Sequence, residues 1–308
     1  MTKPRRHIPG QVALVTRCCS ERRYFLKPDD YIRRVTTFET GKAAERHGQH
    51  IYAAVAMPNY VQFVMGDTTA ERSRFMQDAM SAIARARNRD LGRKGHFWAA
   101  GQFGNRVLMG RDTIERRLLN IWLAPVQAGF VDRAEDWPGL MIMPKHWGET
   151  ITIDKPSRFY GRANPDRVEF TPKRPPGYDD MSLQEVKEHF QRLLKIAEDE
   201  IEAVRQEINQ EANEAGQACE LDPNDSPKTP EPPRRRIPRF ATQNEELMER
   251  ARSIYRRFLD QYETVRQRWV SGKKSVEFPA GTVQLRRCAP VSCAAPPEDE
   301  PTLFAKVE

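Results

Sequence analysis

Two short apolar segments separated by a proline-asparagine pair constrain this chain more than any other part of its sequence. Residues 51 to 57 and 60 to 65 are almost entirely apolar, and Pro58-Asn59 between them is a turn signal. The pattern predicts two adjacent strands. Because side chains alternate between the faces of a strand, Tyr60 and Gln62 are expected to point to one face, and Val61 and Phe63 to the other.

The segments around this pair predict an α+β domain. The apolar residues Ile32, Val35 and Phe38 recur at helical spacing after Asp29 and Asp30, either of which can cap a helix. The order strand, helix, strand, strand, helix, strand, helix is typical of a ferredoxin-like domain, an antiparallel sheet with helices on one face. The remaining elements are expected at residues 11–16 (strand), 70–89 (helix), 106–109 (strand) and from 112 to just before Pro125 (helix).

The segment Met57-Pro58-Asn59-Tyr60-Val61-Gln62 resembles the M-P-N-H-x-H strand of the single-tyrosine HUH transposases, more narrowly the REP-associated tyrosine transposases. The segment 120–131 resembles the catalytic helix of that family, which has a Y-x-x-x-N-P-V-x-A-G-L-V pattern. Together the similar segments cover residues 8 to 180 and about 275 to 288. The other similar segments are 14–19 with Arg22, Arg23 and Phe25, 89–93 with Phe97 and Trp98, 135–139, 170–178, and 278–287.

The resemblance implies a site whose functional residues have been replaced. In the family, the two histidines of the strand hold a divalent metal while the helix tyrosine attacks a scissile phosphate. Here Tyr60 and Gln62 stand at the ligand positions, Asn120 at the nucleophile, and Ala124 at a polar position one turn later. An amide is no activated nucleophile, and a neutral phenol and a single amide oxygen are poor metal ligands. The resemblance therefore predicts a degenerate catalytic site without a metal or other cofactor.

Basic residues gather in the first half of the chain. Residues 71 to 117 carry eleven Lys and Arg against five Asp and Glu, whereas residues 181 to 232 carry five against thirteen. A basic region suits a polyanionic partner, and neighbouring aromatic residues can stack on unpaired bases. The alternative is a solvated basic face with Trp98 in the core. The candidate DNA-binding residues are Arg17, Arg22, Arg23, Arg85, Arg89, Arg93, Lys94, Trp98, Arg116 and Arg117.

Three functions remain open. The first is a DNA-binding protein related to the transposases, inactive in strand cleavage, with hairpin or single-stranded DNA as its partner. The second is an active single-strand transposase with an altered site, in which Tyr60 could serve as a relocated nucleophile. The third is a dimeric assembly protein whose long helices associate and whose basic face is incidental.

The cysteines and the apolar runs restrict the environment of the chain. Five scattered cysteines, without a paired C-x-x-C motif, indicate neither a zinc site nor a disulfide framework, and fit a reducing compartment. No apolar run has the length of an export signal or a membrane span. We therefore expect a cytoplasmic protein that makes no contact with a membrane.

The second half of the chain is predicted to be an extension rather than a second catalytic domain. We expect a transposase-like domain over 1–148 and an irregular, proline-containing connector over 149–180. A helical extension over 181–290 contains two amphipathic helices, about 183–208 and 247–269, around a disordered proline-rich linker at 216–240. These two helices are expected to pair as a helical hairpin or to form a homodimer contact. A short strand and turn end the extension, and residues 291–308 are expected to be a disordered tail.

Overall fold

A six-stranded sheet organises the computed structural model, which describes residues 4–207, 215–230 and 238–296. The strand order is β5-β2-β3-β1-β4-β8. All neighbouring strands are antiparallel except β4 and β8, which are parallel. The strands are β1 (Gln11–Cys18), β2 (Gln49–Met57), β3 (Tyr60–Asp67), β4 (Gly104–Leu108), β5 (Met141–Ile142) and β8 (Phe240–Ala241).

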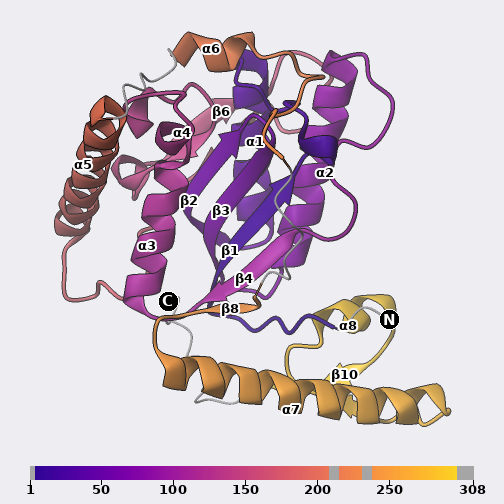
Figure 1. The fold of residues 1–308 in the computed structure, drawn as a ribbon. Helices are drawn as coiled ribbons and strands as arrows, with labels where there is room; N and C mark the ends of the chain where they lie inside the picture. Colours follow the sequence, from indigo (N-terminus) through magenta and orange to yellow (C-terminus); the bar gives the residue numbers. More distant parts are fainter. Residues whose placement is uncertain (1–3, 208–214, 231–237, 297–308) are drawn as a thin grey trace.

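The central four strands confirm the predicted ferredoxin-like arrangement. Their order, β2-β3-β1-β4, is produced by the chain order β1, α1, β2, β3, α2, β4. Helices α1 (Asp30–Arg46) and α2 (Arg72–Asp90) pack side by side against one face of the sheet (Figure 1). Asp29 is the N-cap of α1, because its carboxylate accepts a hydrogen bond from the backbone N–H of Ile32 at 2.7 Å.

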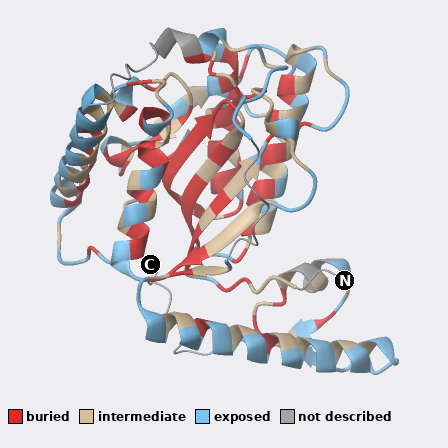
Figure 2. Ribbon diagram, viewed as in Figure 1, coloured by how far each residue is buried: buried red, intermediate tan, exposed pale blue. Residues whose placement is uncertain are grey.

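The opposite face of the sheet carries the third helix, which differs from the expectation of helices on one face only. Helix α3 (Arg111–Trp122) and the short α4 (Ala124–Gln127) contact β2 on this face. The alternation of the strands explains the two layers. Val61 and Phe63 of β3 lie in the core beneath α1 and α2, whereas Val64 lies in the core beneath α3. Figure 2 shows the strands buried between these two layers.

Residues 149–180 are more ordered than the predicted irregular connector. Strands β6 (Ile151–Asp154) and β7 (Arg167–Phe170) form an antiparallel hairpin that packs against α1. The Phe170 ring lies so close to Gly41 of α1 that a Cβ at this position would collide with it. The hairpin therefore belongs to the core of the first half of the chain.

The two long helices form as predicted, but they do not pair with each other. Helix α5 (Leu183–Glu207) begins with the predicted capping box, in which the Glu185 backbone N–H donates to Ser182 Oγ at 3.3 Å and the Ser182 backbone N–H donates to Glu185 Oε2 at 2.7 Å. Helix α5 packs against α3 and α4, whereas α7 (Glu245–Val270) packs against β8 and β9 (Glu277–Phe278). Figure 1 shows them on different sides of the molecule. This placement corrects the predicted helical hairpin. A homodimer stays a prediction.

The predicted linker and tail are only partly described. Residues 215–220 form the short helix α6 (Ala215–Glu220), and residues 231–237 lie outside the described residues. The chain ends its described part with α8 (Val283–Cys288) and β10 (Ser292–Cys293), which pairs in parallel with β9, while residues 297–308 lie outside it. All five cysteines are free thiols. Among the described residues, none of the helices has an apolar run long enough to span a lipid bilayer.

Candidate nucleic-acid interface

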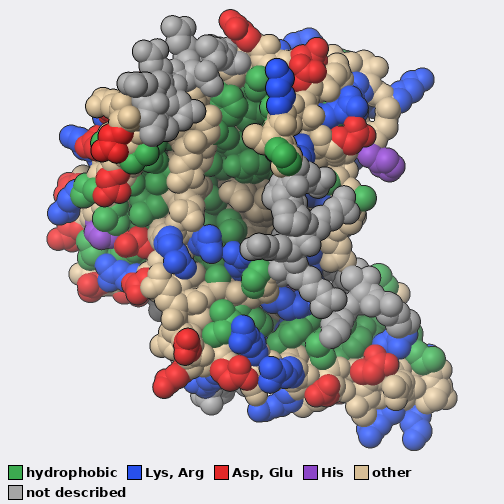
Figure 3. Space-filling view, in the orientation of Figure 1, with side chains coloured by type: hydrophobic (Ala, Val, Ile, Leu, Met, Phe, Trp, Pro, Cys, Tyr) green, Lys and Arg blue, Asp and Glu red, His purple; other side chains and the backbone are tan. Residues whose placement is uncertain are grey.

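Beside α3, part of one sheet face is only partly buried by the residues that the structure describes. Helix α3 contacts β2 and β3, and strands β1 and β4 continue the sheet beyond β3. We call the face made by Leu14, Thr16, Gln62 and Arg106, together with Tyr60, the open face. All five side chains are only partly buried, unlike their neighbours Val12 and Val64 further along the same face. Figure 3 shows this side of the molecule hollowed and apolar, with basic side chains along its lower edge.

The predicted orientation of Tyr60 and Gln62 toward the same face is confirmed. Gln62 lies opposite Thr16 of β1 and donates from Nε2 to Thr16 Oγ1 at 3.1 Å. Tyr60 lies opposite Cys18, and burial, followed by the neighbouring Cys18, raises the pKa of the Tyr60 phenol to about 12. The phenol is therefore neutral at physiological pH.

These side chains do not fit a divalent metal. Gln62 uses its amide nitrogen on Thr16 and keeps one neutral oxygen, while Tyr60 is a neutral phenol. Among the residues that the structure describes, no group of three or more His, Cys, Asp or Glu side chains is placed to hold a metal ion.

The residues at the positions expected for the nucleophile and for the polar group are Asn120 and Ala124. Asn120 is exposed on α3, and Ala124 is half-buried at the start of α4. An amide side chain is both donor and acceptor, but it has no hydroxyl or thiol that a base could activate.

Three arginines with mutually repelling charges lie beside the open face. Burial lowers the pKa of Arg117, and the neighbouring charges of Arg106 and Arg116 lower it further. Burial also lowers the pKa of Arg106, which donates to the carbonyl oxygen of Pro238 at 3.3 Å. Among the described residues, no carboxylate acts on the pKa of either arginine, and the buried Arg117 Nε makes no hydrogen bond. Such a cluster favours an anion.

Arg106 is the member of this cluster that the sequence-based prediction omitted. It lies opposite Leu14 in the pairing of β1 with β4, and it shares the face of Leu108, two residues later in the strand. Strand alternation places its side chain on this face once β4 is recognised. The signal was therefore present in the sequence, but only as a single basic residue in a short strand.

The other predicted DNA-binding residues do not lie together on the open face. Arg23 forms an ion pair with Glu21 at 2.6 Å, and Arg93 stacks on the Phe25 ring at 3.6 Å. Arg22 donates to the carbonyl oxygen of Thr229 at 2.6 Å. Arg22, Arg23, Arg93 and Lys94 thus lie around the turn after β1, and Arg85 and Arg89 are exposed on α2.

Arg17 and Trp98 lie on the other face of the sheet. Arg17 follows Thr16 in β1, so its side chain points away from the open face, and it donates to the carbonyl oxygen of Gly101 at 2.8 Å. Trp98 packs against the core beneath α1 and α2 and donates from Nε1 to the carbonyl oxygen of Met80 at 2.8 Å. Of the predicted set, the structure therefore places Arg116 and Arg117 next to the open face.

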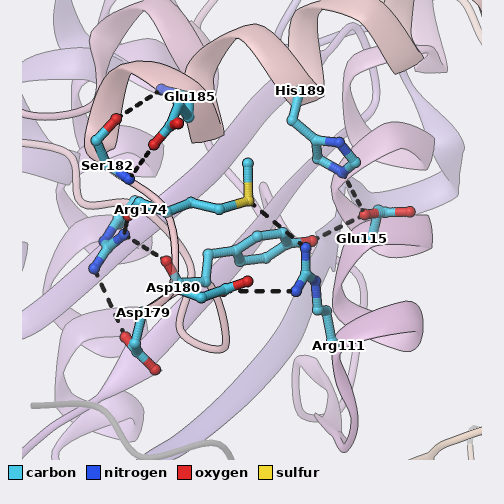
Figure 4. A network of polar contacts seen from close by, with 10 residues as sticks. Arg111, Glu115, Arg174, Asp179, Asp180, Ser182, Glu185 and His189 are labelled. Carbon is cyan, nitrogen blue, oxygen red and sulfur yellow. Dashed lines mark hydrogen bonds and ion pairs between the residues drawn. The ribbon is translucent and has the colours of Figure 1, made fainter.

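A polar network fixes α3 beside this face (Figure 4). Glu115 of α3 accepts hydrogen bonds from the Tyr178 hydroxyl at 2.9 Å and lies 2.9 Å from His189 Nε2 of α5. The Arg111 guanidinium stacks on the Tyr178 ring at 3.9 Å. Burial raises the pKa of the Tyr178 phenol, and the Glu115 carboxylate raises it further. Tyr178 therefore stays a hydrogen-bond donor to Glu115.

The fold and the face together define an α+β, ferredoxin-like domain with an arginine cluster next to a sheet face that the described residues bury only in part. A solved structure of a REP-associated tyrosine transposase bound to a REP hairpin is similar to this chain, with a TM-score of 0.38 and 17% sequence identity over 45% of this chain and 81% of that chain. No family model matches this chain, and no curated protein matches it. The proposals that follow rest on the residues of the chain and their chemistry.

Proposed function

We propose that this chain is a transposase-like DNA-binding protein. Its open face binds the DNA, which is either single-stranded or hairpin-forming. The observation that carries the proposal is the cluster of Arg106, Arg116 and Arg117. Burial lowers the pKa of Arg106 and of Arg117, the charges of Arg106 and Arg116 lower that of Arg117 further, and no carboxylate among the described residues compensates them. A phosphate backbone would neutralise the cluster and release condensed counterions. The half-buried Leu14 and Tyr60 beside it offer apolar surface to unpaired bases.

We propose further that the bound strand is not cleaved. Tyr60 is a neutral phenol, Gln62 is engaged with Thr16, and Asn120 has no activatable oxygen. The retained scaffold around these positions favours reuse of the fold for binding. The same proposal includes that the protein holds no metal cofactor at this face.

The binding proposal is tested with a charge-neutralising triple variant. Arg106→Gln, Arg116→Gln and Arg117→Gln together should weaken binding to a labelled hairpin with a single-stranded extension, measured by fluorescence anisotropy. Because each lost phosphate contact removes counterion release, the slope of log affinity against log salt should become shallower by about 2. The matched control combines Arg192→Gln, Lys195→Gln and Arg257→Gln, three exposed positions on α5 and α7 with the same change in charge. The control should bind like the unmodified chain.

A second triple variant separates the open face from the surface of α2. Arg85→Gln, Arg89→Gln and Arg93→Gln remove the basic residues predicted on the end of this helix. Weakened binding by this variant, with full binding by the Arg106, Arg116 and Arg117 variant, would move the interface to α2. Absence of DNA binding by the unmodified chain at low salt would instead favour the assembly protein. Sedimentation of the same sample would then show whether the predicted homodimer forms.

The cleavage proposal is tested with magnesium or manganese and the same hairpin. No covalent protein–DNA adduct should survive denaturing electrophoresis, because neither a metal site nor a nucleophile is available. An adduct that disappears in Tyr60→Phe would contradict this proposal and establish the alternative of an active transposase with an altered site. Tyr262→Phe, on α7, is the control for loss of a phenol.

A further inference from the structure

A large cavity lies on the face of the sheet opposite the open face. Its volume is about 670 Å³, which is in the range of small-molecule sites. It lies between α2, the loop after Trp98, the segment before β1, and α8. Met76 and Met80, which line it, also belong to the core beneath α1 and α2, and so place the cavity on that side of the sheet.

The lining of the cavity is basic. Arg5, Arg17 and Arg74 line it, and no Asp or Glu is among the described residues of its lining. Arg74 is paired with Glu71 at 3.2 Å. Arg5 and Arg17 are held in place by backbone carbonyl oxygens, Arg5 by Phe103 at 2.6 Å and Arg17 by Gly101 at 2.8 Å. Each of these two guanidiniums keeps further N–H groups for a ligand, since a guanidinium has five.

Among the described residues, no carboxylate compensates the charges of Arg5 and Arg17. Burial lowers the pKa of Arg5 to about 10, and the nearby cations Arg72 and Arg239 lower it further. Burial also lowers the pKa of Arg17. A bound anion would therefore relieve both the desolvation and the repulsion between like charges.

The remaining wall suits a planar apolar group with polar edges. Trp98, Phe103, Met76 and Met80 supply aromatic and thioether surface. Trp98 is held by its hydrogen bond to the Met80 carbonyl oxygen, and the Phe103 ring is covered on one side by Arg5 at 4.3 Å. The polar groups for the edge of a ring are the side chains of Ser73, Gln77, Ser81 and Gln102.

We propose that this cavity binds a nucleotide, with its phosphate on Arg5 and Arg17 and its base against Trp98 and the two methionines. Arginine guanidiniums match phosphate geometry through paired N–H groups, and the apolar wall accommodates the base. The ligand is either a free nucleotide or an unpaired nucleotide of a strand, because the two offer the same chemistry. The proposal does not rest on DNA binding at the open face, which lies across the sheet.

The position of three exposed cysteines allows a direct test. Cys288 lines the cavity, Cys18 lies at the end of β1 next to the open face, and Cys219 lies in α6. The rate of alkylation of each thiol is measured by peptide mass spectrometry with dAMP, deoxyadenosine or inorganic phosphate. We expect dAMP to slow the labelling of Cys288 alone, and to bind at least about tenfold more tightly than deoxyadenosine by calorimetry, because the charged hydrogen bonds to phosphate are lost with the nucleoside.

Two kinds of variant test whether the protection of the Cys288 thiol arises from binding in the cavity. Arg5→Gln with Arg17→Gln should weaken dAMP binding about tenfold or more through loss of the phosphate contacts. Ser81→Phe keeps both guanidiniums and fills the cavity, so it should also remove binding. Arg192→Gln with Lys195→Gln, two exposed positions on α5, is the control for the loss of two charges.

A 5′-phosphorylated single strand distinguishes the two sources of the ligand. Protection of Cys288 by dAMP but not by the strand supports a free nucleotide, and protection by the strand supports an unpaired nucleotide of DNA. If neither slows the labelling of Cys288, or if deoxyadenosine binds as tightly as dAMP, the proposal is wrong. Protection of Cys18 by DNA reports separately on the open face.

Discussion

Burial controls the protonation of Tyr60, and this has a measurable effect on stability at high pH. The pKa of Tyr60 is raised to about 12 in the folded chain, above the ordinary value of 10.0 for a tyrosine. The folded state therefore holds its proton more tightly. The corresponding stability is fully present below pH 10 and is lost as the pH rises toward 12. Tyr60→Phe should lose less of its free energy of unfolding between pH 9 and pH 11 than the unmodified chain, measured by urea denaturation. An equal loss in both would contradict the raised pKa.

The orientation or role of a side chain was predictable from the sequence where it depends on residues nearby in the chain. The shared orientation of Tyr60 and Gln62 follows from strand alternation alone, and the Asp29 cap follows from its position before an amphipathic helix. The sequence alone does not decide the role of Trp98, because its partner, the Met80 carbonyl oxygen, is supplied by tertiary packing. The grouping of Arg106 with Arg117 likewise depends on how α3 lies across the sheet.

Among the elements, the existence of a helix was predictable, but the surface that it covers was not. The apolar seam of α5 and the segment Ser182 to Glu185 before and within it correctly predicted where the helix begins and its capping box. A single apolar seam fits any complementary surface, so the sequence could not choose between α7 and the side of α3. The deciding residues are Phe190 on α5 and the aromatic side chains of Trp122 and Trp147, which come from two other segments of the chain.

Replacing Phe190 tests whether α5 belongs to the main core. Its side chain is fully buried and lies edge-on to Trp122 and Trp147, with ring centroids 5.7 Å and 5.2 Å away. Phe190→Ala should lower the free energy of unfolding by about 3–5 kcal/mol, because it removes buried apolar area and leaves a cavity. Near-ultraviolet circular dichroism of the tryptophans and far-ultraviolet circular dichroism should report the same transition. Ile196→Ala, at an exposed position on α5, should have little effect. Separate transitions would show that α5 unfolds independently of the core.

In the whole molecule, residues on both sides of position 148 share one core. Val186, Phe190 and Leu194 of α5, together with Tyr178, are buried in the same cluster as Trp122 of α3. Strand β8, from far later in the chain, extends the sheet at β4. The composition changes near residue 148, where proline and charge become frequent, but this change marks the connection between elements more than the end of the packed core.

The shared core predicts how shortened chains will behave. A chain of residues 1–148 should lack a cooperative unfolding transition, because it would expose the apolar surface that Tyr178 and α5 cover. It should also bind a hydrophobic dye, as partly packed states do. A chain of residues 1–207 retains α5 and should unfold cooperatively, although it lacks β8 and α7. Calorimetry of the two chains measures whether each has a cooperative unfolding transition. A cooperative transition of the 1–148 chain, at the temperature of the 1–207 chain, would show that the first half folds without the second.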